Sequence, residues 1–371
     1  MSKCFDQNFD HKKISYDLEK FNLPEWALSI IKEKYPQVDS LDNLHNTLTT
    51  TEIVDASSIV QKKCESEEFV GLIDGIIEEN IKPFFPHKEL MIQRFGTMRV
   101  VVPQQEKKGR LLNFHTGIFN GNGWGLRTVW TPLTEAFDTN TMWVVPWEKS
   151  QEISKRSIKE QWDYDTIQDE NAKYAFPVNI SPGQSHLFTQ GHWHGNFNNE
   201  TNKTRVSIDM RILVEGEQFH RKLPGGYFRF LGDNPNNKII DNSNKEFITY
   251  AGWNSTYSKY IPLPLQRRQI DEYCELNNIK YNDYQFELEF MDWLPNFEKF
   301  IKSRKQDGIV LMSIWSLPDD EQRRDELLQI AFDNKVELHF ANENLVLKNE
   351  NDLNYIKKVL SFSKDTSSPK F

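Results

Sequence analysis

The first eighty residues of the chain carry apolar positions at helical spacing. Pro24 stands near the start of one such segment and Trp26 follows it, which suits a helix start. A second segment, 55–80, repeats its apolar residues every three or four positions and ends before Pro83, a residue that disfavours helix in the position preceding it. We therefore expect helices that pack against a sheet and take no part in chemistry.

From Leu90 onward the pattern changes to short apolar runs separated by glycine, asparagine and proline. Many short strands at close spacing predict an antiparallel sandwich or barrel rather than a parallel sheet. A polar, helical insertion at 150–174 interrupts them. The architecture that fits best is a double-stranded β-helix (jelly roll) with the N-terminal helices packed outside. The expected strands are 90–95, 98–102, 111–119, 126–132, 141–145, 178–180, 185–188, 192–197 and 204–213.

A third pattern begins near Lys245, where short strands and helices alternate. This alternation predicts a parallel sheet of βαβ units, and therefore a small Rossmann-like α/β domain. The segment 233–244 is rich in Asn, Asp and Pro, so it is a candidate linker. The predicted domains are 1–232 and 245–364. Strands are expected at 247–251, 308–312 and 336–340, and helices at 264–277, 319–333 and 352–361.

Composition and charge narrow the possible partners. The 371 residues carry a formal net charge of −9, and an acidic chain repels a phosphate backbone, so neither a nucleic acid nor an anionic membrane is expected as a partner. No run approaches the roughly 18 apolar residues of a membrane span. Residues 1–13 have no secretory apolar core, and the three cysteines are far apart. We expect a soluble, cytoplasmic protein with a small-molecule substrate, and its oligomeric state is left open.

Residues that could bind a metal or a carboxylate lie on three of the expected strands. Alternate residues of a strand share a face, so Arg205, Ser207 and Asp209 point to the same side. Two histidines on facing strands, His115 and His194, can converge with a carboxylate as the facial triad that binds non-haem iron(II). An arginine eleven positions after the second histidine (205 − 194) can hold a carboxylate bidentately, and Ser207 can add a hydrogen bond.

The residues around His194 resemble a known family. His194-Gly195-Asn196, Asn199 and Arg205 fall at the offsets of the pattern H-G-S-x-x-N-x-S-x-x-x-R, and Arg205-Val206-Ser207 matches R-x-S. Segments 140–150 and 181–184 resemble two further motifs of the same family, and His115-Thr116-Gly117 falls where that family has H-x-D. Residues 88–214 are thus similar to the iron(II)- and 2-oxoglutarate-dependent oxygenases of the phytanoyl-CoA dioxygenase-like group.

The resemblance implies which residues carry the reaction. His115 and His194 would bind Fe(II), and Arg205 with Ser207 would bind 2-oxoglutarate. His115, His194 and Arg205 are therefore the expected catalytic residues. The spacing to Arg205 selects His194 as the second metal ligand in preference to His192. The implied activity is that of a dioxygenase that hydroxylates a C–H bond of a polar metabolite.

One position departs from the family pattern, because Gly117 stands where the iron-binding Asp is expected. Three hypotheses follow. In the first, chloride takes the vacated iron position. A glycine or alanine at this position resembles the 2-oxoglutarate-dependent halogenases, in which chloride does so. A carboxylate from elsewhere, such as Glu135 or Asp138, completes the site. Or the domain has lost iron and is a non-catalytic, cupin-like binding protein. The intact remainder of the motifs favours the oxygenase.

The second domain resembles two families. Tyr250-Ala251-Gly252-Trp253-Asn254-Ser255 looks like the Y-A-R-V-S-T start of resolvase-type serine recombinases. Gly252 replaces the arginine and Asn254 the nucleophilic serine, so recombination is not expected. Segments 250–252, 264–266, 308–311 and 338–343 are more similar to a small family named for sporadically distributed carbohydrate-biosynthesis clusters. That family implies a sugar or nucleotide sugar of surface-carbohydrate biosynthesis as the substrate.

Overall fold

The computed structural model describes residues 11–103, 113–120, 122–219, 222–233, 242, 244–252, 261–287 and 291–362. The chain forms two compact units, one from Met1–Leu223 with Phe228–Pro235 and one from Pro224–Tyr227 with Asn236–Phe362. The expected linker at 233–244 lies almost wholly outside the described residues. The domain bounds 1–232 and 245–364 stay predictions.

The first unit begins with an edge strand, β1 (His11–Ser15), and continues with α1 (Leu23–Lys34), α2 (Leu44–Thr47), α3 (Thr50–Lys63) and α4 (Glu67–Asn80). The helix expected at 55–80 is therefore two helices. Ser66 separates them, because its side chain accepts a hydrogen bond from the Phe69 N–H and caps α4. Thr49 and Glu52 form a capping box at the start of α3.

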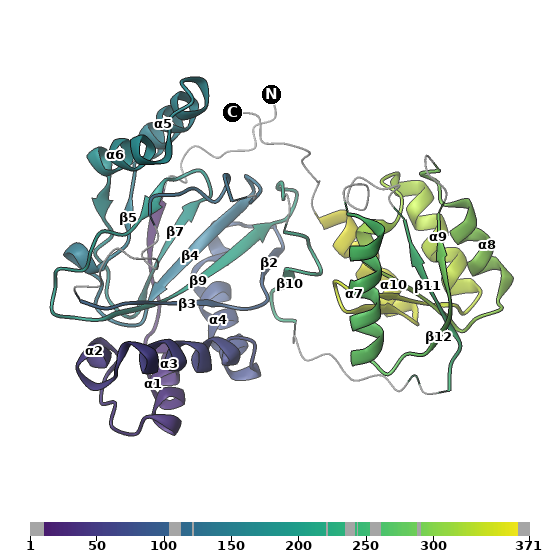
Figure 1. Ribbon diagram of the computed structural model, residues 1–371, viewed down its shortest axis with the longest axis horizontal. Helices are drawn as coiled ribbons and strands as arrows, with labels where there is room; N and C mark the ends of the chain where they lie inside the picture. Colours follow the sequence, from purple (N-terminus) through teal and green to yellow (C-terminus); the bar gives the residue numbers. More distant parts are fainter. Residues whose placement is uncertain are drawn as a thin grey trace. The chain divides into compact units, whose positions relative to one another are not determined.

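The main sheet of the first unit is antiparallel, in the order β1-β7-β4-β9-β2-β10, with β3 also pairing β9. The expected strands at 90–95, 98–102, 126–132, 185–188 and 204–213 are all present in it, with bounds that differ by a few residues at most. Helices α1, α3 and α4 cover one face of this sheet, below it in Figure 1. The strands are β2 (Leu90–Gln93), β3 (Thr97–Val101), β4 (Leu126–Pro132), β7 (Gln184–Thr189), β9 (Arg205–Val214) and β10 (Phe228–Phe230).

A smaller antiparallel sheet, β6-β5-β8, forms the other layer: β5 (Trp143–Val144), β6 (Phe176–Pro177) and β8 (His194–Gly195). His115 joins this sheet by an isolated antiparallel bridge to His194. The strand expected at 111–119 is not formed: residues 111 and 112 lie outside the described residues, and 113–119 form a turn in which His115 makes only an isolated bridge. The expected strand at 192–197 is only two residues long. The insertion predicted at 150–174 is the helix pair α5 (Trp147–Lys159) and α6 (Tyr164–Tyr174).

Successive side chains of β9 face the apolar core on one side and the cavity on the other. Val206, Ile208, Met210 and Ile212 belong to the same apolar cluster as the helices. The odd-numbered residues from Arg205 to Arg211 point the opposite way, toward the smaller sheet, because successive side chains of a strand alternate between faces. Both faces of β9 are covered, and so most of its residues are buried. The polar side chains between the sheets must therefore find partners there.

The second unit is a mostly parallel sheet in the order β12-β11-β13-β14-β15, in which only β15 runs antiparallel to its neighbour. The predicted alternation of strands and helices is confirmed. The sequence pattern did not predict edge strand β12, because its residues are mostly polar and none of them is buried. The strands are β11 (Phe247–Ala251), β12 (Tyr281–Phe286), β13 (Gly308–Leu311), β14 (Glu337–Phe340) and β15 (Leu345–Leu347), and the helices α7 (Leu263–Leu276), α8 (Pro295–Ser303), α9 (Glu321–Asp333) and α10 (Glu350–Phe362).

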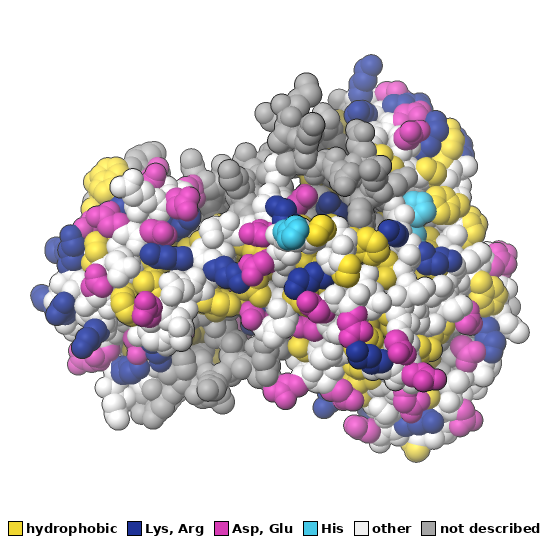
Figure 2. Space-filling view, turned by 180° about the vertical axis from the view of Figure 1, so that it is seen from behind, with side chains coloured by type: hydrophobic (Ala, Val, Ile, Leu, Met, Phe, Trp, Pro, Cys, Tyr) yellow, Lys and Arg dark blue, Asp and Glu magenta, His cyan; other side chains and the backbone are white. Residues whose placement is uncertain are grey.

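Acidic and basic side chains alternate over the surface seen in Figure 2, with no large area of one sign. None of the described helices has the length and the apolar composition that crossing a membrane requires.

Candidate functional site

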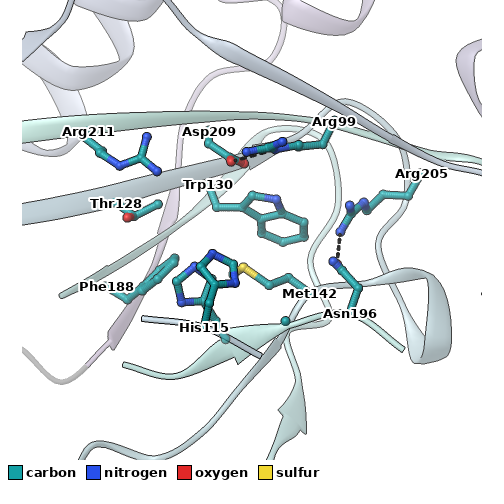
Figure 3. A pocket seen from close by; sticks show the side chains of 12 residues that line it. Arg99, His115, Thr128, Trp130, Met142, Phe188, Asn196, Arg205, Asp209 and Arg211 are labelled. Atoms are coloured by element: carbon teal, nitrogen blue, oxygen red, sulfur yellow. Dashed lines mark hydrogen bonds and ion pairs between the residues drawn. The ribbon is translucent and has the colours of Figure 1, made fainter. Parts of the chain in front are cut away.

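A narrow cavity lies between the two sheets of the first unit, and three of the predicted site residues, His115, His194 and Arg205, line it, whereas Ser207 does not (Figure 3). Its volume is about 40 Å³, whereas pockets that hold small ligands usually measure about 300–1,000 Å³. A ligand larger than a few waters therefore requires lining side chains to move. The lining residues are Arg99, His115, Thr128, Trp130, Met142, Phe188, His194, Gly195, Asn196, Arg205, Asp209 and Arg211.

His115 and His194 form a matched pair. Each backbone N–H donates to the other's carbonyl at 3.0 Å, and the ring centres are 4.3 Å apart. His115 Nδ1 lies 2.9 Å from the Asn113 carbonyl, and His194 Nδ1 lies 3.0 Å from the His192 carbonyl. A carbonyl only accepts hydrogen bonds, so both Nδ1 atoms carry the proton and both Nε2 atoms keep a lone pair.

The surroundings keep both imidazoles neutral. Burial lowers the pKa of His115 below its usual value, and the charges of Arg99 and Arg211 lower it further. Burial, and then the neighbouring His115 and Arg211, hold the pKa of His194 well below its usual value. Neutral imidazoles with a fixed tautomer are the form in which histidine binds metal ions.

The pair fits two positions around one metal ion. At a metal–nitrogen distance of about 2.1 Å and an angle of about 90°, two imidazole centres would lie about 4.5 Å apart, close to the 4.3 Å observed. A third protein ligand is missing, since no group of three or more His, Cys, Asp or Glu among the described residues is placed to hold a metal. His115 and His194 can therefore supply two ligands, and the facial triad is incomplete.

The space beside Gly117, where an aspartate side chain would begin, is filled by other side chains. A Cβ added to Gly117 would lie 1.8 Å from Gln190 Oε1 and 2.7 Å from Asn122 Nδ2. Gln190 is held there because its Oε1 accepts a hydrogen bond from Asn122 Nδ2 at 2.6 Å and its Nε2 donates to Thr128 Oγ1 at 2.8 Å. The space that the chloride hypothesis needs at position 117 is therefore occupied by the Gln190 amide.

The two carboxylates suggested as replacements lie elsewhere. Glu135 accepts a hydrogen bond from Ser181 Oγ at 2.7 Å and lines a different cavity, beside Asn22 and Pro24. Asp138 is exposed, and its backbone N–H donates to Asn179 Oδ1. Neither residue lines the cavity of His115 and His194. The hypothesis that Glu135 or Asp138 completes the metal site is wrong, because spacing along the chain does not reveal which face of a turn points inward.

Arg205 and Ser207 supply groups that suit a carboxylate. Arg205 is buried, its Nη1 donates to Asn196 Oδ1 at 3.2 Å, and its guanidinium carbon lies 5.5 Å from the centre of the Trp130 ring. Arg205 Nε and Ser207 Oγ make no hydrogen bond within the described part of the chain. Burial lowers the pKa of Arg205 to about 10. A carboxylate beside Arg205 would meet the unsatisfied Nε–H and a positive charge, while Ser207 lies on the same face of β9 but does not line the cavity.

For three charged residues that line the cavity, Arg99, Asp209 and Arg211, no role was predicted from the sequence. Arg99 Nε and Asp209 Oδ2 form an ion pair at 3.2 Å on the strand face of Arg205. Arg211 lies farther along the same face, and its Nη1 donates to Gln93 Oε1 at 3.1 Å. The two-residue period from Arg205 could have found Arg211, as it found Asp209, whereas Arg99 comes from a neighbouring strand.

Comparison with protein families gives no match, and comparison with curated proteins gives none either. Among solved structures, the chain is similar to the non-haem α-ketoglutarate-dependent carbocyclase SnoK from nogalamycin biosynthesis, with 14% identity, TM-score 0.32, and coverage of 58% of this chain and 86% of that one. It is similar to CytC3, solved with Fe(II) and α-ketoglutarate, at 13% identity, TM-score 0.35 and coverage of 57% and 75%. A resolvase-family recombinase from Streptococcus pneumoniae aligns at 14% identity, TM-score 0.27 and coverage of 31% and 84%. These likenesses are weak, so the assignment of function rests on the cavity.

Proposed function

We propose that the first unit is a double-stranded β-helix with the activity of an iron(II)- and 2-oxoglutarate-dependent oxygenase. In this proposal His115 and His194 bind the metal, and Arg205 and Ser207 bind the far carboxylate of 2-oxoglutarate. The reaction is hydroxylation of a C–H bond of a polar metabolite, such as a sugar or nucleotide sugar, in the cytoplasm. The second unit is an accessory α/β domain like that of the sporadic carbohydrate-cluster family.

One observation carries the proposal: a single cavity is lined by two neutral histidines with free Nε2 lone pairs and by a buried guanidinium whose Nε makes no hydrogen bond within the described residues. An unpartnered buried polar group is costly, and it is usually kept for a ligand or for catalysis. The lone pairs suit a divalent metal, and the Arg205 end suits a carboxylate. A metal-chelating dicarboxylate such as 2-oxoglutarate would use both ends.

The residues of the chain prepare the site for that ligand. When bound, Fe(II) with 2-oxoglutarate supplies activation of dioxygen for C–H oxidation. The backbone carbonyls of Asn113 and His192 keep the Nε2 atoms unprotonated. Trp130 and Phe188 provide apolar walls that limit the access of water. Met142, a flexible side chain, is the lining residue best able to move and enlarge the cavity.

A second candidate function is a carboxylate-binding protein without iron. The missing third ligand and the occupied position 117 favour it. Arg205 and Ser207 would then bind an organic acid, and His115 and His194 would serve only as hydrogen-bonding groups. Recombination by the second unit stays disfavoured by Gly252, while Asn254 lies outside the described residues.

The deciding experiment is anaerobic absorbance spectroscopy of the full chain with Fe(II) and 2-oxoglutarate, with and without chloride. The oxygenase predicts a charge-transfer band that needs both additions. Arg205→Ala should weaken 2-oxoglutarate binding about 10- to 100-fold, because a charge-assisted hydrogen bond is lost. Arg156→Ala is the matched control, since Arg156 is an exposed residue of α5 paired with Glu160.

The two candidates give different results. If no band appears but calorimetry shows 2-oxoglutarate binding that depends on Arg205 and not on iron, the second candidate holds. A band that shifts with chloride would restore the halogenase hypothesis despite the packing at Gly117. Unchanged affinity in Arg205→Ala would show that the carboxylate binds elsewhere.

A further inference from the structure

The second unit contains a cavity that is large enough for a small ligand. Its volume is about 370 Å³, within the range of about 300–1,000 Å³ that pockets for small molecules occupy. Neither function proposed for the first unit uses it. The cavity lies at the amino ends of β11 and β12 and beside the carboxyl end of α8. Ligands of open α/β sheets usually bind at the opposite, carboxyl ends of the strands, so the fold alone does not predict a site here.

A β-bulge places one polar side chain at this cavity. In the parallel pair of β11 and β12, Phe247 pairs with Tyr281. The next residue, Ile248, pairs with Asp283, so Asn282 has no partner in β11. A bulge redirects the side chain of the extra residue, is rare between parallel strands, and is common beside functional sites. Asn282 lines the cavity, and its amide makes no hydrogen bond within the described part of the chain. It is therefore free to donate to a ligand.

Apolar side chains form one wall of the cavity. Phe247 and Ile248 are buried, Phe300 is half-buried, and all three line it. The Phe300 carbonyl accepts hydrogen bonds from Ser303 Oγ at 2.8 Å and from Gln306 Nε2 at 3.0 Å, which fixes the end of α8 beside this wall. The wall thus exists before a ligand binds, and it favours a ring or another apolar group that is removed from water there.

Two lysines at the cavity have no anionic partner. Lys299 and Lys305 line it, and neither forms an ion pair with any described residue. The next lysine of α8, Lys302, does not line the cavity and is paired with Glu298. Among the described lining residues the only carboxylate is that of Glu246, so their charges sum to +1 (2 − 1). The unpaired ammonium groups attract a small anion.

We propose that this cavity of the second unit binds a small organic anion, one that joins a phosphate or carboxylate group to an aromatic ring. The anionic group lies beside Lys299 and Lys305, and Asn282 donates a hydrogen bond to one of its oxygens. The ring lies against Phe300 and Ile248. An uncharged ring lacks the first set of contacts, and a bare inorganic anion lacks the second. The site gives the second unit a binding role that depends on neither iron nor 2-oxoglutarate.

The test measures binding of phenyl phosphate and of benzoate to the full chain by isothermal titration calorimetry at low ionic strength. Every protein carries Arg205→Gln, which disables the anion site proposed for the first unit. Adding Lys299→Gln together with Lys305→Gln should weaken binding about 10-fold, because charge-assisted hydrogen bonds are lost. The matched control adds Lys302→Gln together with Lys335→Gln, which changes the net charge equally but outside the cavity. It should bind both probes like the parent.

Two further comparisons test the other contacts. Asn282→Asp keeps the shape of the side chain but replaces a donor by a negative charge, so it should weaken binding. Inorganic phosphate and acetate, the same anions without the ring, should bind about 10-fold more weakly than phenyl phosphate and benzoate. The tighter of the two ring probes identifies the anionic group. Circular dichroism checks the fold of each variant.

Three results would overturn the inference. Neither ring probe binds the parent, or the Lys299 and Lys305 variant binds like its control, or the bare anions bind as tightly as the ring probes. The assay contains neither iron nor 2-oxoglutarate, and Arg205 is replaced in every protein. A failure here therefore leaves the proposed function of the first unit standing, and the absence of a charge-transfer band would leave this site standing.

Discussion

Two buried polar side chains, Glu287 of the second unit and Arg205 of the first, differ in how far their hydrogen bonds are made within the chain. In the second unit, Glu287 accepts from Tyr250 OH at 2.6 Å, Asn296 N at 3.0 Å and Phe297 N at 3.3 Å, so it holds the start of α8 against β11. At the cavity of the first unit, Arg205 Nε makes no hydrogen bond within the described residues. Buried polar atoms without a hydrogen bond occur in both units, so Arg205 is distinguished by its charge and by its place in the cavity of the two histidines.

The difference is not a matter of residue type, because the first unit also contains a buried arginine that has a carboxylate partner. Arg229 binds Asp74 through both of its Nη atoms, at 2.9 and 2.6 Å, and also donates to the Phe230 and Asp233 carbonyls. Arg205 is equally buried and binds a neutral amide. The first unit thus gives the guanidinium of Arg229 a carboxylate partner, whereas that of Arg205 binds an amide, and the Nε of each makes no hydrogen bond within the described residues.

The largest effect is expected from Glu287→Ala. It removes the acceptor of three buried or partly buried donors, and it should lower the free energy of unfolding by about 3–5 kcal/mol. Hydrogen exchange should show the loss in β11 and α8. Glu272→Ala, which removes an exposed carboxylate of α7, is the control and should change stability by about 0.5 kcal/mol or less. A loss below about 1 kcal/mol in Glu287→Ala would mean that satisfied hydrogen bonds are not what holds this unit.

The next effect concerns pH. Glu343 accepts from Ser313 Oγ, Ile314 N and Asn342 Nδ2, and yet burial raises its pKa from 4.5 to about 7. A raised acid pKa means that stabilisation is fully present below the unfolded pKa and is lost as the pH rises through the folded value. The wild type should therefore lose about 3 kcal/mol between about pH 4.5 and pH 8 relative to Glu343→Gln.

Urea unfolding at several pH values gives this difference directly. Glu343→Gln mimics the protonated acid, so its stability should not show the fall seen in the wild type. Glu272→Gln should follow the wild type at every pH. Parallel pH profiles for the wild type and Glu343→Gln would show that Glu343 stays ionised in the fold.

A smaller effect is expected at the edge of the cavity. Gly117→Ala places a methyl group 1.8 Å from Gln190 Oε1, and it should lower stability by about 1–3 kcal/mol. Combined with Gln190→Ala, the two losses should be less than additive, because the closest obstruction is gone, while Asn122 Nδ2, at 2.7 Å from the added Cβ, remains. Gly71→Ala in α4, where a Cβ meets nothing within 4 Å, is the matched control and should be neutral or stabilising. Additive losses would mean that Gln190 moves away without cost.

Periodicity predicted the central strands of the two larger sheets and missed their edge strands β1, β10, β12 and β15. β4 and β11 have their expected bounds, and the two-residue period of β9 placed Arg205, Ser207 and Asp209 on one face. The helix break at Ser66 depends on a capping bond, which the apolar pattern of 55–80 does not reveal.

Contacts between segments far apart in the chain could not be predicted from the local sequence pattern. Gln190 fills the position beside Gly117 from another strand end, 73 residues later (190 − 117). Arg99 reaches Asp209 only because β3 pairs with β9 in one particular register, in which Thr97 faces Asp209. Contacts of this kind follow from strand pairing, and pairing between distant segments is not encoded in local periodicity.

The smallest effect has the opposite sign. Arg205→Met replaces a buried, partly satisfied cation by a flexible apolar side chain beside Trp130. If Arg205 is kept for a ligand, its removal should raise the free energy of unfolding by about 1 kcal/mol in the absence of ligands, while binding of 2-oxoglutarate is lost. Arg156→Met at the surface should leave both quantities unchanged. A clear loss of stability in Arg205→Met would show that this guanidinium, like that of Arg229, is a structural group, and the contrast between the cavity and the rest of the chain would then disappear.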